Sequence, residues 1–581
     1  MAPASTIPGH LRRFVVRQDY AKYTEQDQAV WRFVVLQTHS RLLTTAHDAY
    51  AKGFDAAGIS VDRIPRVDEM NDKLGRFGWG AVCVDGFISP RAFQAFQARG
   101  ILPIAADIRT SKHLTYTPAP DIIHEAAGHA PFLADARYAR YVRRIGEVAR
   151  RAFAVPSDRA VYDAIYQLSE LKEDPASTLL QVRRAEQALS TATSLVTETS
   201  ESAKIARLYW WTAEYGLVGS ASDFRLYGAG LLSSIGEGYF CRLPDVKKLA
   251  LTRECVEFDY DVTRAQPQLF VAKNFGQLEE VLDEVDATLS YRTGGVGALA
   301  MAKRSEELAT VALDSGVEVI GVVTTTLTHE GRPSLIGFKG PTALAHGGML
   351  VDGMPRRTDY LLPLGVLLDG TPLSSLTPDD VLSRAPSGNL ILELRSGLVI
   401  TGGVRAMVPM NGRVGALLLS EFELWRGEER LLRANHYALA LGASVETAWA
   451  GAPDAFFPDS PASTVTVPKA RTFSEPELEM IALYDRAITA FGSSFGSATV
   501  AELAVILAQL DDSFPDEWLL RWNLLESLAK LGEGSDLAGR LERDLERLEL
   551  RYDGKEPIAT GLDYVRSLLG LEPSRGHRNA G

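Results

Sequence analysis

The sequence predicts a chain of three parts: a mainly α-helical part over residues 1–295, a β-rich or mixed part over 296–470 and a helical part over 471–581. Three observations support this division. Apolar residues recur at helical spacing in the first part, and β-branched or alternating runs begin near residue 316. A helix start signal then appears at Ser474. A chain of 581 residues is also too long for one compact core, so we expect two to four domains.

The first part is rich in helical patterns, with a few short β-type runs between them. Segment 81–86 (AVCVDG) is such a run and ends in turn residues, after which Ser89 and Pro90 are typical of a helix start. A long helical pattern covers residues 27–54. Its apolar face includes Val30, Phe33, Val34, Leu42 and Leu43.

The middle part contains apolar runs separated by Gly, Pro and Asp, which is typical of strands. These runs are VEVIGVVTTTL, DYLLPLGVLL, NLILELRSGLVITGG and GALLLSEFELW. Four prolines within 453–472 predict a linker, after which Ser474 and Glu477 have the spacing of a capping box. Helical patterns continue from there through DEWLLRWNLLESLAKLGEG and DLAGRLERDLERLELRYDG, and no internal repeat is apparent.

Composition excludes several classes of protein. The chain is 46% hydrophobic and 23% charged, as in ordinary globular proteins, and 61 basic against 74 acidic residues give a net charge of -13. An acidic surface repels phosphate backbones, so we expect no nucleic-acid partner. The sequence has no signal-peptide pattern and no run of about 18 apolar residues, so we expect no membrane span. Three cysteines without CxxC spacing favour a reducing, cytoplasmic setting.

Residues 116–135 (YTPAPDIIHEAAGHAPFLAD) hold the most informative cluster, because imidazole and carboxylate groups suit a divalent first-row metal. The segment looks superficially like the zinc-protease motif HExxH, in which the histidines are four residues apart. Here His124 and His129 are five apart, about 140° around an ideal α-helix. Both can bind one ion only if the helix is distorted or ends, and Gly128 with Pro131 favours such a break.

The same residues have a plainer interpretation, in which both histidines are structural. Taken from composition and spacing alone, the metal and structural interpretations are about evenly balanced. A zinc hydrolase is the least favoured alternative, because the spacing of the histidines is wrong for the protease helix.

Several segments resemble the aromatic amino-acid hydroxylases, which act on phenylalanine, tyrosine and tryptophan. The resemblance covers roughly the first half of the chain in the order of the family, and it is strongest to the bacterial phenylalanine hydroxylases. The segments that resemble the family most closely are 109–135, 208–219 (LYWWTAEYGLVG) and 227–240 (YGAGLLSSIGEGYF), with further similarity in 18–32, 62–93 and 258–275.

By this resemblance, the first half has the mainly α fold of that family, and His124, His129 and Glu214 hold an iron(II) ion. Two histidines and one carboxylate on one side of iron leave its other side open for water, dioxygen and substrate. Asp121 and Glu125 then orient the histidines or the water on the pterin side, and Glu125 is the candidate catalytic residue. Without the resemblance, Glu214 reads as an ordinary charge on an amphipathic helix.

The resemblance also implies a substrate site for a free aromatic amino acid. Arg109 matches the anchor for the substrate carboxylate, because a guanidinium grips a carboxylate with two parallel hydrogen bonds. Thr117 and Ser233 are the expected hydroxyl donors beside it. The expected walls of the ring pocket, which favour a flat apolar side chain, are Pro120, Trp210, Tyr215 and Gly230.

The cofactor that the resemblance implies is a tetrahydropterin, tetrahydrobiopterin or a related compound. Phe93 matches the aromatic residue that stacks on the pterin, and Gly86 and Ile88 lie in the loop expected to approach it. The implied reaction is hydroxylation of phenylalanine to tyrosine with dioxygen. Tryptophan or tyrosine hydroxylation is the alternative; Trp210 mildly disfavours tryptophan, and Tyr215 replaces an expected phenylalanine.

Two features depart from the family. The gap from His129 to Glu214 is 85 residues, about twice that of the family, which predicts a helical insertion within about 155–202. Nothing after about residue 295 matches, so the β-rich part has no assigned role, and the last hundred residues are expected to mediate self-association into a homo-oligomer. His329 and His346 have no partner spacing for a metal site.

An inactive homologue that serves as a scaffold is a further alternative, disfavoured because all the presumed ligands are present.

Overall fold

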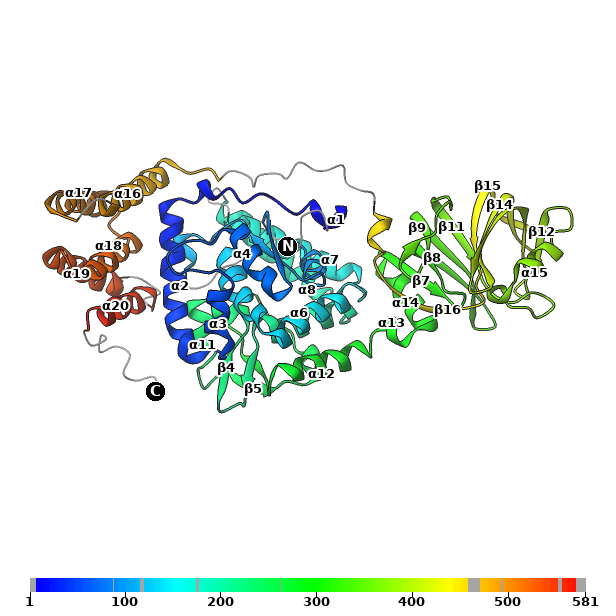
Figure 1. Ribbon diagram of the computed structural model, residues 1–581, viewed down its shortest axis with the longest axis horizontal. Helices are drawn as coiled ribbons and strands as arrows, with labels where there is room; N and C mark the ends of the chain where they lie inside the picture. Colours follow the sequence, from blue (N-terminus) through cyan, green and yellow to red (C-terminus); the bar gives the residue numbers. More distant parts are fainter. Residues whose placement is uncertain are drawn as a thin grey trace.

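The computed structural model describes residues 7–86, 88–114, 120–173, 177–262, 264–457, 471–492, 495–551 and 556–570. Figure 1 shows three groups of elements along its longest axis: a central, mainly helical group, two sheets at one end and a set of helices beside α2 at the other. In the part of the chain that the structure describes, no helix is both long enough and apolar enough to cross a bilayer.

The central group contains most of the helices and two small sheets. Strands β1 (Gly80–Val84) and β2 (Ile101–Ala105) pair in parallel, and the second sheet has the order β4 (Phe224–Leu226), β3 (Leu217–Gly219), β6 (Gln268–Ala272), β5 (Lys247–Ala250). The α-helices up to residue 305 are α1 (Gly9–Arg12), α2 (Glu25–Thr45), α3 (Ala49–Ala56), α4 (Val67–Leu74), α5 (Pro90–Gln97), α6 (Ala136–Ala149), α7 (Pro156–Glu173), α8 (Leu179–Ser194), α9 (Glu201–Tyr209), α10 (Ala229–Ser233), α11 (Ile235–Phe240), α12 (Phe275–Asp286), α13 (Ser290–Thr293) and α14 (Gly295–Ser305).

The helical pattern of residues 27–54 corresponds to two helices, α2 and α3, rather than one. Thr24 caps α2 by accepting a hydrogen bond from the Asp27 backbone. Four of the five residues expected on the apolar face are buried, but Leu43 is exposed, and its assignment to that face was wrong. The chain turns after Thr45, so the last turn of α2 faces solvent on the side where the pattern predicts burial.

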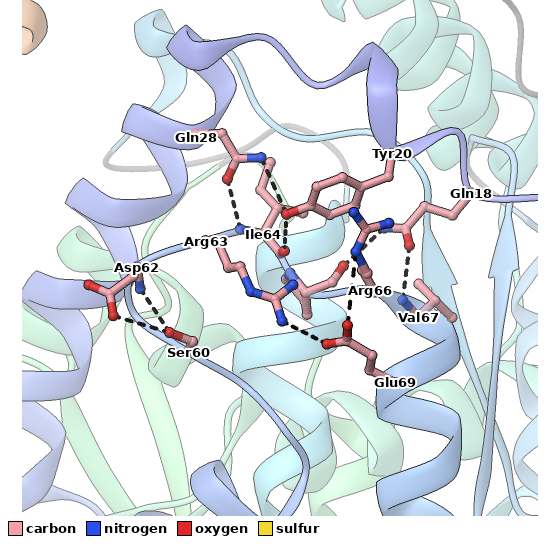
Figure 2. A network of polar contacts seen from close by, with 11 residues as sticks. Gln18, Tyr20, Gln28, Ser60, Asp62, Arg63, Ile64, Arg66, Val67 and Glu69 are labelled. Carbon is pink, nitrogen blue, oxygen red and sulfur yellow. Dashed lines mark hydrogen bonds and ion pairs between the residues drawn. The ribbon is translucent and has the colours of Figure 1, made fainter. Parts of the chain in front are cut away.

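A network of side chains holds the segment that leads into α4 (Figure 2). Gln28 of α2 accepts a hydrogen bond from the Ile64 backbone N–H, and the Tyr20 hydroxyl donates to the Ile64 carbonyl. Gln18 accepts from the Val67 N–H at the start of α4. These bonds satisfy backbone groups that no helix or strand would pair. They fix α4, which packs against β1, the strand that precedes Gly86.

The second group contains two sheets built almost entirely from antiparallel strands, and the predicted apolar runs fall on strands β8, β11, β12, β13 and β14. One sheet has the order β10-β9-β8-β7-β16, with β11 also paired to β9, and the other has the order β12-β13-β14-β15. The strands are β7 (Leu308–Leu313), β8 (Val317–His329), β9 (Arg332–His346), β10 (Met349–Leu350), β11 (Arg357–Pro363), β12 (Asn389–Glu393), β13 (Leu398–Met410), β14 (Arg413–Arg426), β15 (Glu429–Ala440) and β16 (Val445–Ala450). A short helix, α15 (Pro378–Ser383), precedes β12.

These two sheets share a single hydrophobic core. Tyr437 stacks on Phe422 with ring centroids 3.9 Å apart and on Tyr360 at 5.2 Å. Ala298 and Leu299 of α14 are buried in the same core, so this helix packs with the sheets that follow it. Offset aromatic stacking adds to the apolar burial that holds the two sheets together.

The last group contains helices α16 (Glu475–Gly492), α17 (Ser497–Ser513), α18 (Leu519–Leu531), α19 (Ser535–Arg551) and α20 (Glu556–Leu568). Phe33 of α2 contacts Trp518 and Trp522 edge to face, at 5.1 and 4.7 Å between ring centroids. Arg471 forms an ion pair with Asp27. Helix α2 of the same chain therefore covers one face of this group. The self-association predicted for residues 471–581 would use the other faces, and it stays a prediction.

Replacing Glu237 of α11 with glutamine should stabilise the chain above neutral pH. Burial raises the pKa of Glu237 from 4.5 to about 7. The unfolded chain therefore loses this proton first, and stability falls as pH rises from 4.5 through 7. Because glutamine carries no charge at any pH, the variant should gain on the order of 1–3 kcal/mol at pH 8 and little at pH 4.

Denaturant unfolding of both proteins at pH 4, 6 and 8 measures this effect. Glu280→Gln, an exposed glutamate on α12, is the matched control for the same substitution outside the core. A gain for Glu237→Gln that is independent of pH would contradict the assignment of the effect to ionisation.

Candidate metal centre

Two short π-helices carry the three predicted metal ligands. The first, η5, spans Ile123–His129 and contains both histidines, and the second, η7, spans Trp210–Glu214 and ends on the carboxylate. In each, a backbone N–H reaches the carbonyl five residues back. Residues five apart therefore lie nearly above one another, as His124 and His129 must do to reach one ion. The sequence predicts that the helix is either distorted here or ends, and in the structure the helix is distorted.

Gly128 allows this distortion because no side chain fits at its position. A Cβ atom there would lie 2.7 Å from the Ala229 carbonyl oxygen and 3.1 Å from the Ala229 Cβ. Helix α10, which begins at Ala229, thus packs directly on the backbone of η5. Glycine is required here for close packing, and the sequence indicated it only as a helix breaker.

Gly128→Ala should therefore push η5 away from α10 and spread the histidines. We expect the free energy of unfolding to fall by about 1–3 kcal/mol, the usual cost of an inserted methyl group in a packed core. Metal content should fall with it, because the two imidazoles no longer share one position. Unfolding curves and metal analysis of the purified protein measure both effects. Gly297→Ala is the control, since a Cβ atom there meets nothing within 4 Å. Full metal content in Gly128→Ala would contradict the expected coupling.

The ligand atoms of the three residues lie close together. His124 Nε2 and His129 Nε2 are 3.2 Å apart, and each lies 3.1 Å from a different oxygen of Glu214. Among the described residues, this is the one group of three or more His, Cys, Asp or Glu side chains close enough to hold an ion. An ion held by these three groups would keep coordination positions for other ligands.

Charge and hydrogen bonding prepare these groups as ligands. Burial opposes ionisation of Glu214, but the two imidazoles outweigh it and lower its pKa, so the carboxylate is anionic. The Ser233 hydroxyl donates to the Ala229 carbonyl and lies 3.1 Å from His124 Nδ1. Since that hydroxyl has used its proton, it accepts from Nδ1–H, which leaves Nε2 as the nitrogen of His124 that faces Glu214. Burial lowers the pKa of His124, but the charge of Glu214 outweighs it and raises that pKa to about 9, so a metal ion would displace a proton from Nε2.

Arg109 and Asp121 form a buried ion pair beside this cluster. The guanidinium donates from Nε and Nη2 to the two carboxylate oxygens, both at 2.8 Å, and from Nη1 to the Ser233 carbonyl at 3.2 Å. Burial would raise the pKa of Asp121, but the charge and hydrogen bonds of Arg109 lower it. Among the described residues, these bonds use three of the five N–H groups of the guanidinium, which leaves one on Nη1 and one on Nη2. These two N–H groups are of the kind that bind a second carboxylate.

Asp121 also positions the first histidine. Its Oδ1 accepts a hydrogen bond from the His124 backbone N–H at 3.0 Å. The sequence predicts that Asp121 orients the histidines. Its contacts with Arg109 show that it also holds the guanidinium. The pairing of these two residues was not part of the sequence prediction.

Aromatic side chains gather on the other side of Glu214. Trp210 stacks on Tyr215 with ring centroids 4.6 Å apart and on Tyr260 at 4.3 Å. A Cβ atom on Gly230 would lie 3.0 Å from the Tyr215 ring, so the chain passes close to that ring. The indole N–H of Trp210 is buried without a partner among the described residues. The predicted wall residues Trp210, Tyr215 and Gly230 therefore lie together.

The residues predicted to hold the pterin lie at one edge of the cluster. The ring of Phe93, on α5, is half-buried and 6.0 Å from the ring of His129. Gly86 follows β1 in a left-handed conformation (φ +61°), with nothing within 4 Å of the position a Cβ would take. Ile88 differs, because its side chain is packed in a small apolar cluster with Phe96. Only the backbone of Ile88 is left to make the predicted approach to the pterin ring.

Glu125 is buried between these groups. Burial raises its pKa to about 8, and its Oε2 has no hydrogen-bond partner among the described residues. A buried polar atom without a partner is costly unless a ligand or water satisfies it. Of the other predicted substrate residues, Pro120 is exposed, and Thr117 lies outside the described residues.

Sequence reasoning missed two aromatic residues of the site. Tyr260 stacks on Trp210, and Tyr209 lies 6.4 Å from the rings of both Phe93 and His129. The Tyr209 hydroxyl accepts a hydrogen bond from Gln97 of α5 at 2.6 Å. Both residues lie in the segments that resemble the family, 208–219 and 258–275. Their aromatic character was the available signal, but nothing in the spacing distinguishes them from core residues.

Comparison with known proteins gives a consistent answer for this half of the chain. The model of the biopterin-dependent aromatic amino acid hydroxylase family matches residues 16–154 and 185–293. Phenylalanine-4-hydroxylase of Caulobacter vibrioides is 27% identical over 314 residues, which cover 54% of this chain and 87% of that protein. The enzyme of Mesorhizobium japonicum is 28% identical over 277 residues, covering 47% and 84%.

A crystal structure of phenylalanine hydroxylase from Chromobacterium violaceum, bound to cobalt, has 24% sequence identity and a TM-score of 0.36; it covers 47% of this chain and 82% of the other. The family match leaves out residues 155–184, which hold α7 and the start of α8 and fall within the predicted insertion. It includes the π-helices that carry His124, His129 and Glu214. The part of this chain that contains the cluster therefore matches a biopterin-dependent aromatic amino acid hydroxylase domain.

Proposed function

We propose that this chain hydroxylates free phenylalanine to tyrosine with dioxygen, using an iron(II) ion held by His124, His129 and Glu214 and a tetrahydropterin. The observation that carries the proposal is the convergence of two imidazoles and one carboxylate from two π-helices, with the two Nε2 atoms 3.2 Å apart and each 3.1 Å from a Glu214 oxygen. Relatives from bacteria and mammals named phenylalanine-4-hydroxylase support the choice of substrate.

The donor set fits ferrous iron. Two neutral imidazoles and one anionic carboxylate on one side are typical of non-haem iron(II) oxygenases, whereas a structural zinc site would be closed by a fourth ligand. Bound iron(II) and reduced pterin would supply the activation of dioxygen that ring hydroxylation requires. The protein residues have four tasks beside that chemistry: to bind the substrate, to orient it, to place the pterin and to exclude water.

Arg109 would bind the carboxylate of the amino acid through its free Nη1–Nη2 edge, while Asp121 holds the opposite edge. Such a fork orients the substrate as well as attracting it. Trp210 and Tyr215 would then place the aromatic ring beside the open side of the metal position. Because both ends of the substrate are fixed, the ring is held in one orientation during reaction.

On the pterin side, Phe93 would stack on the flat ring of the cofactor, and the open backbone at Gly86 would approach it. Glu125 would face that ring or a water beside it; a carboxyl whose pKa burial raises to about 8 can donate a hydrogen bond as well as accept one. This assigns a partner to the Glu125 oxygen that lacks one.

We also propose that the hydroxylase unit ends near residue 295 and that 296–470 form a separate β-rich module. The helix that follows this boundary, α14, contributes Ala298, Leu299 and Ala302 to the core of the sheets rather than to that of the hydroxylase unit. The described helices between residues 475 and 568, in contrast, share the core of the hydroxylase unit through α2.

The test is product analysis. Iron-loaded protein is incubated with tetrahydrobiopterin, dioxygen and each aromatic amino acid in turn, and the products are identified by mass spectrometry. Tyrosine from phenylalanine, at a higher kcat/KM than any product from tyrosine or tryptophan, is the expected result. Failure to hydroxylate all three amino acids, in protein shown to contain iron, would refute the proposal.

A further inference from the structure

The β-rich module contacts both ends of α5, the helix that carries Phe93. At the start of α5, Arg91 donates to Glu307 at 2.7 Å. Just past its end, Arg99 donates from Nη2 to both carboxylate oxygens of Asp454, at 2.5 and 2.7 Å. Glu307 directly precedes β7 and Asp454 follows β16. These two strands pair with each other, so the module presents both carboxylates from one edge.

Each carboxylate also lies near further basic side chains of the hydroxylase unit. Glu307, whose side chain is 14% exposed, lies 3.5 Å from Arg159 at the start of α7, within the stretch that the family match leaves out. Asp454 lies 3.9 Å from Arg150 and 3.8 Å from His10. Isolated surface ion pairs contribute little, but carboxylates that join several cations from different helices hold those helices in register.

The module has other attachments that do not depend on these carboxylates. The Ala450 backbone N–H donates to the Arg151 carbonyl at 3.0 Å, and Phe153 is fully buried in the core of the module. Thr447 donates to the Tyr291 carbonyl at 2.8 Å. Removing the charge of Glu307 or Asp454 should therefore leave the module in place and affect mainly α5.

Helix α5 connects these contacts to the metal centre. Phe93 lies two residues after Arg91, and its ring is 6.0 Å from that of His129. Gln97, in the last turn, donates to the hydroxyl of Tyr209, which directly precedes the π-helix η7. A helix of eight residues moves as a rigid body, so fixing both of its ends fixes the ring of Phe93.

We propose that Glu307 and Asp454 are positioning residues for the pterin: the β-rich module braces α5 from both ends and thereby holds Phe93 against the cofactor. The proposal rests on the proposed function, because it takes Phe93 as the residue that stacks on the pterin. It assigns the module a role in the reaction. Because coupling between two sites is reciprocal, the module should affect binding of the cofactor, and the bound cofactor should affect how the module is held.

The experiment compares Glu307→Gln, Asp454→Asn and the double variant with the wild-type full-length chain. Two measurements are made: steady-state kinetics, varying tetrahydrobiopterin and phenylalanine separately, and calorimetric binding of 7,8-dihydrobiopterin to iron-loaded protein. In the double variant we expect the KM for tetrahydrobiopterin and the Kd for 7,8-dihydrobiopterin to rise about five- to twentyfold. The KM for phenylalanine and the iron content should stay within about twofold of wild type.

Two controls separate positioning from general damage. Glu279→Gln removes a similar two-bond ion pair, Arg140 to Glu279 at 2.5 and 2.8 Å, from the α6–α12 contact and should change neither constant. The exchange of charges in Arg91→Glu with Glu307→Arg should restore much of the pterin affinity that Glu307→Arg alone loses. Unchanged pterin constants in the double variant would overturn the proposal, as would an equal rise in the KM for phenylalanine. Failure of the proposed function is a different result, a wild-type protein that binds iron but hydroxylates nothing.

Discussion

Glu214→Gln should remove most of the bound iron and lower turnover by at least about a hundredfold, because the loss of groups that merely support metal ligands already costs 10–100-fold. Glutamine keeps the shape of the side chain but removes its negative charge. Glu214 is the anionic member of this group of three, and it lies 3.1 Å from each histidine through a different oxygen. Its amide would place an N–H where one carboxylate oxygen approaches an imidazole. Metal analysis and single-turnover hydroxylation of phenylalanine measure the two effects.

The control for this experiment is Glu318→Gln in the β-rich module, a buried glutamate that accepts hydrogen bonds from the Gly348 backbone. It should leave iron content unchanged. If Glu214→Gln retained full iron and wild-type turnover, the carboxylate would not be a ligand, and a scaffold role for the cluster would become the better interpretation.

The sequence allowed part of this site to be predicted from the residues alone. The five-residue spacing of His124 and His129, with Gly128 between them, requires a break from α-helical geometry if both bind one ion, and the π-helix has that geometry. Glu214 could not be found in this way. Its segment is an amphipathic helix whose last five residues become π-helical, and the contact with the histidines depends on tertiary packing 85 residues away.

Local patterns likewise predicted elements better than contacts. The capping signals at Ser89 and Ser474 mark true helix starts, because a cap is made within four residues. Leu43 fits the apolar spacing of α2 and is nevertheless exposed, while its neighbour Leu42 is buried, and the spacing alone does not distinguish the two. The ion pair between Arg91 and Glu307 joins residues 216 positions apart, and no periodicity in a single chain carries that information.

Arg109→Ala should have the second large effect, on stability and on substrate binding together. Arg109 is 2% exposed and Asp121 is 3% exposed, so removal of the guanidinium leaves a buried carboxylate without its partner. Breaking a buried pair in this way costs about 3–5 kcal/mol, part of which Asp121 can recover through its bond from the His124 backbone. Unfolding by denaturant at pH 7 measures the loss.

Arg109→Lys separates charge from geometry. The ammonium keeps the ion pair with Asp121, so Arg109→Lys should lose less stability than Arg109→Ala. A point charge, however, cannot hold Asp121 on one edge and a substrate carboxylate on another. We expect the KM for phenylalanine to rise by about tenfold or more while the KM for tetrahydrobiopterin stays the same, since two charge-assisted hydrogen bonds are worth roughly 1.5–3 kcal/mol each. An equal rise in both constants would show that the substitution disturbs the whole site.

The double variant Arg109→Met with Asp121→Leu then decides what the ion pair is for. Replacing both members of a buried pair with apolar residues is often neutral for stability, because no charge is left without a partner. Here it should recover most of the free energy of unfolding that Arg109→Ala loses, short of the hydrogen bonds that Asp121 accepts from the Arg109 and His124 backbones. Phenylalanine binding should not recover, because the free edge of the guanidinium is gone. Recovery of both would mean that Arg109 is a structural residue only and that the substrate carboxylate binds elsewhere.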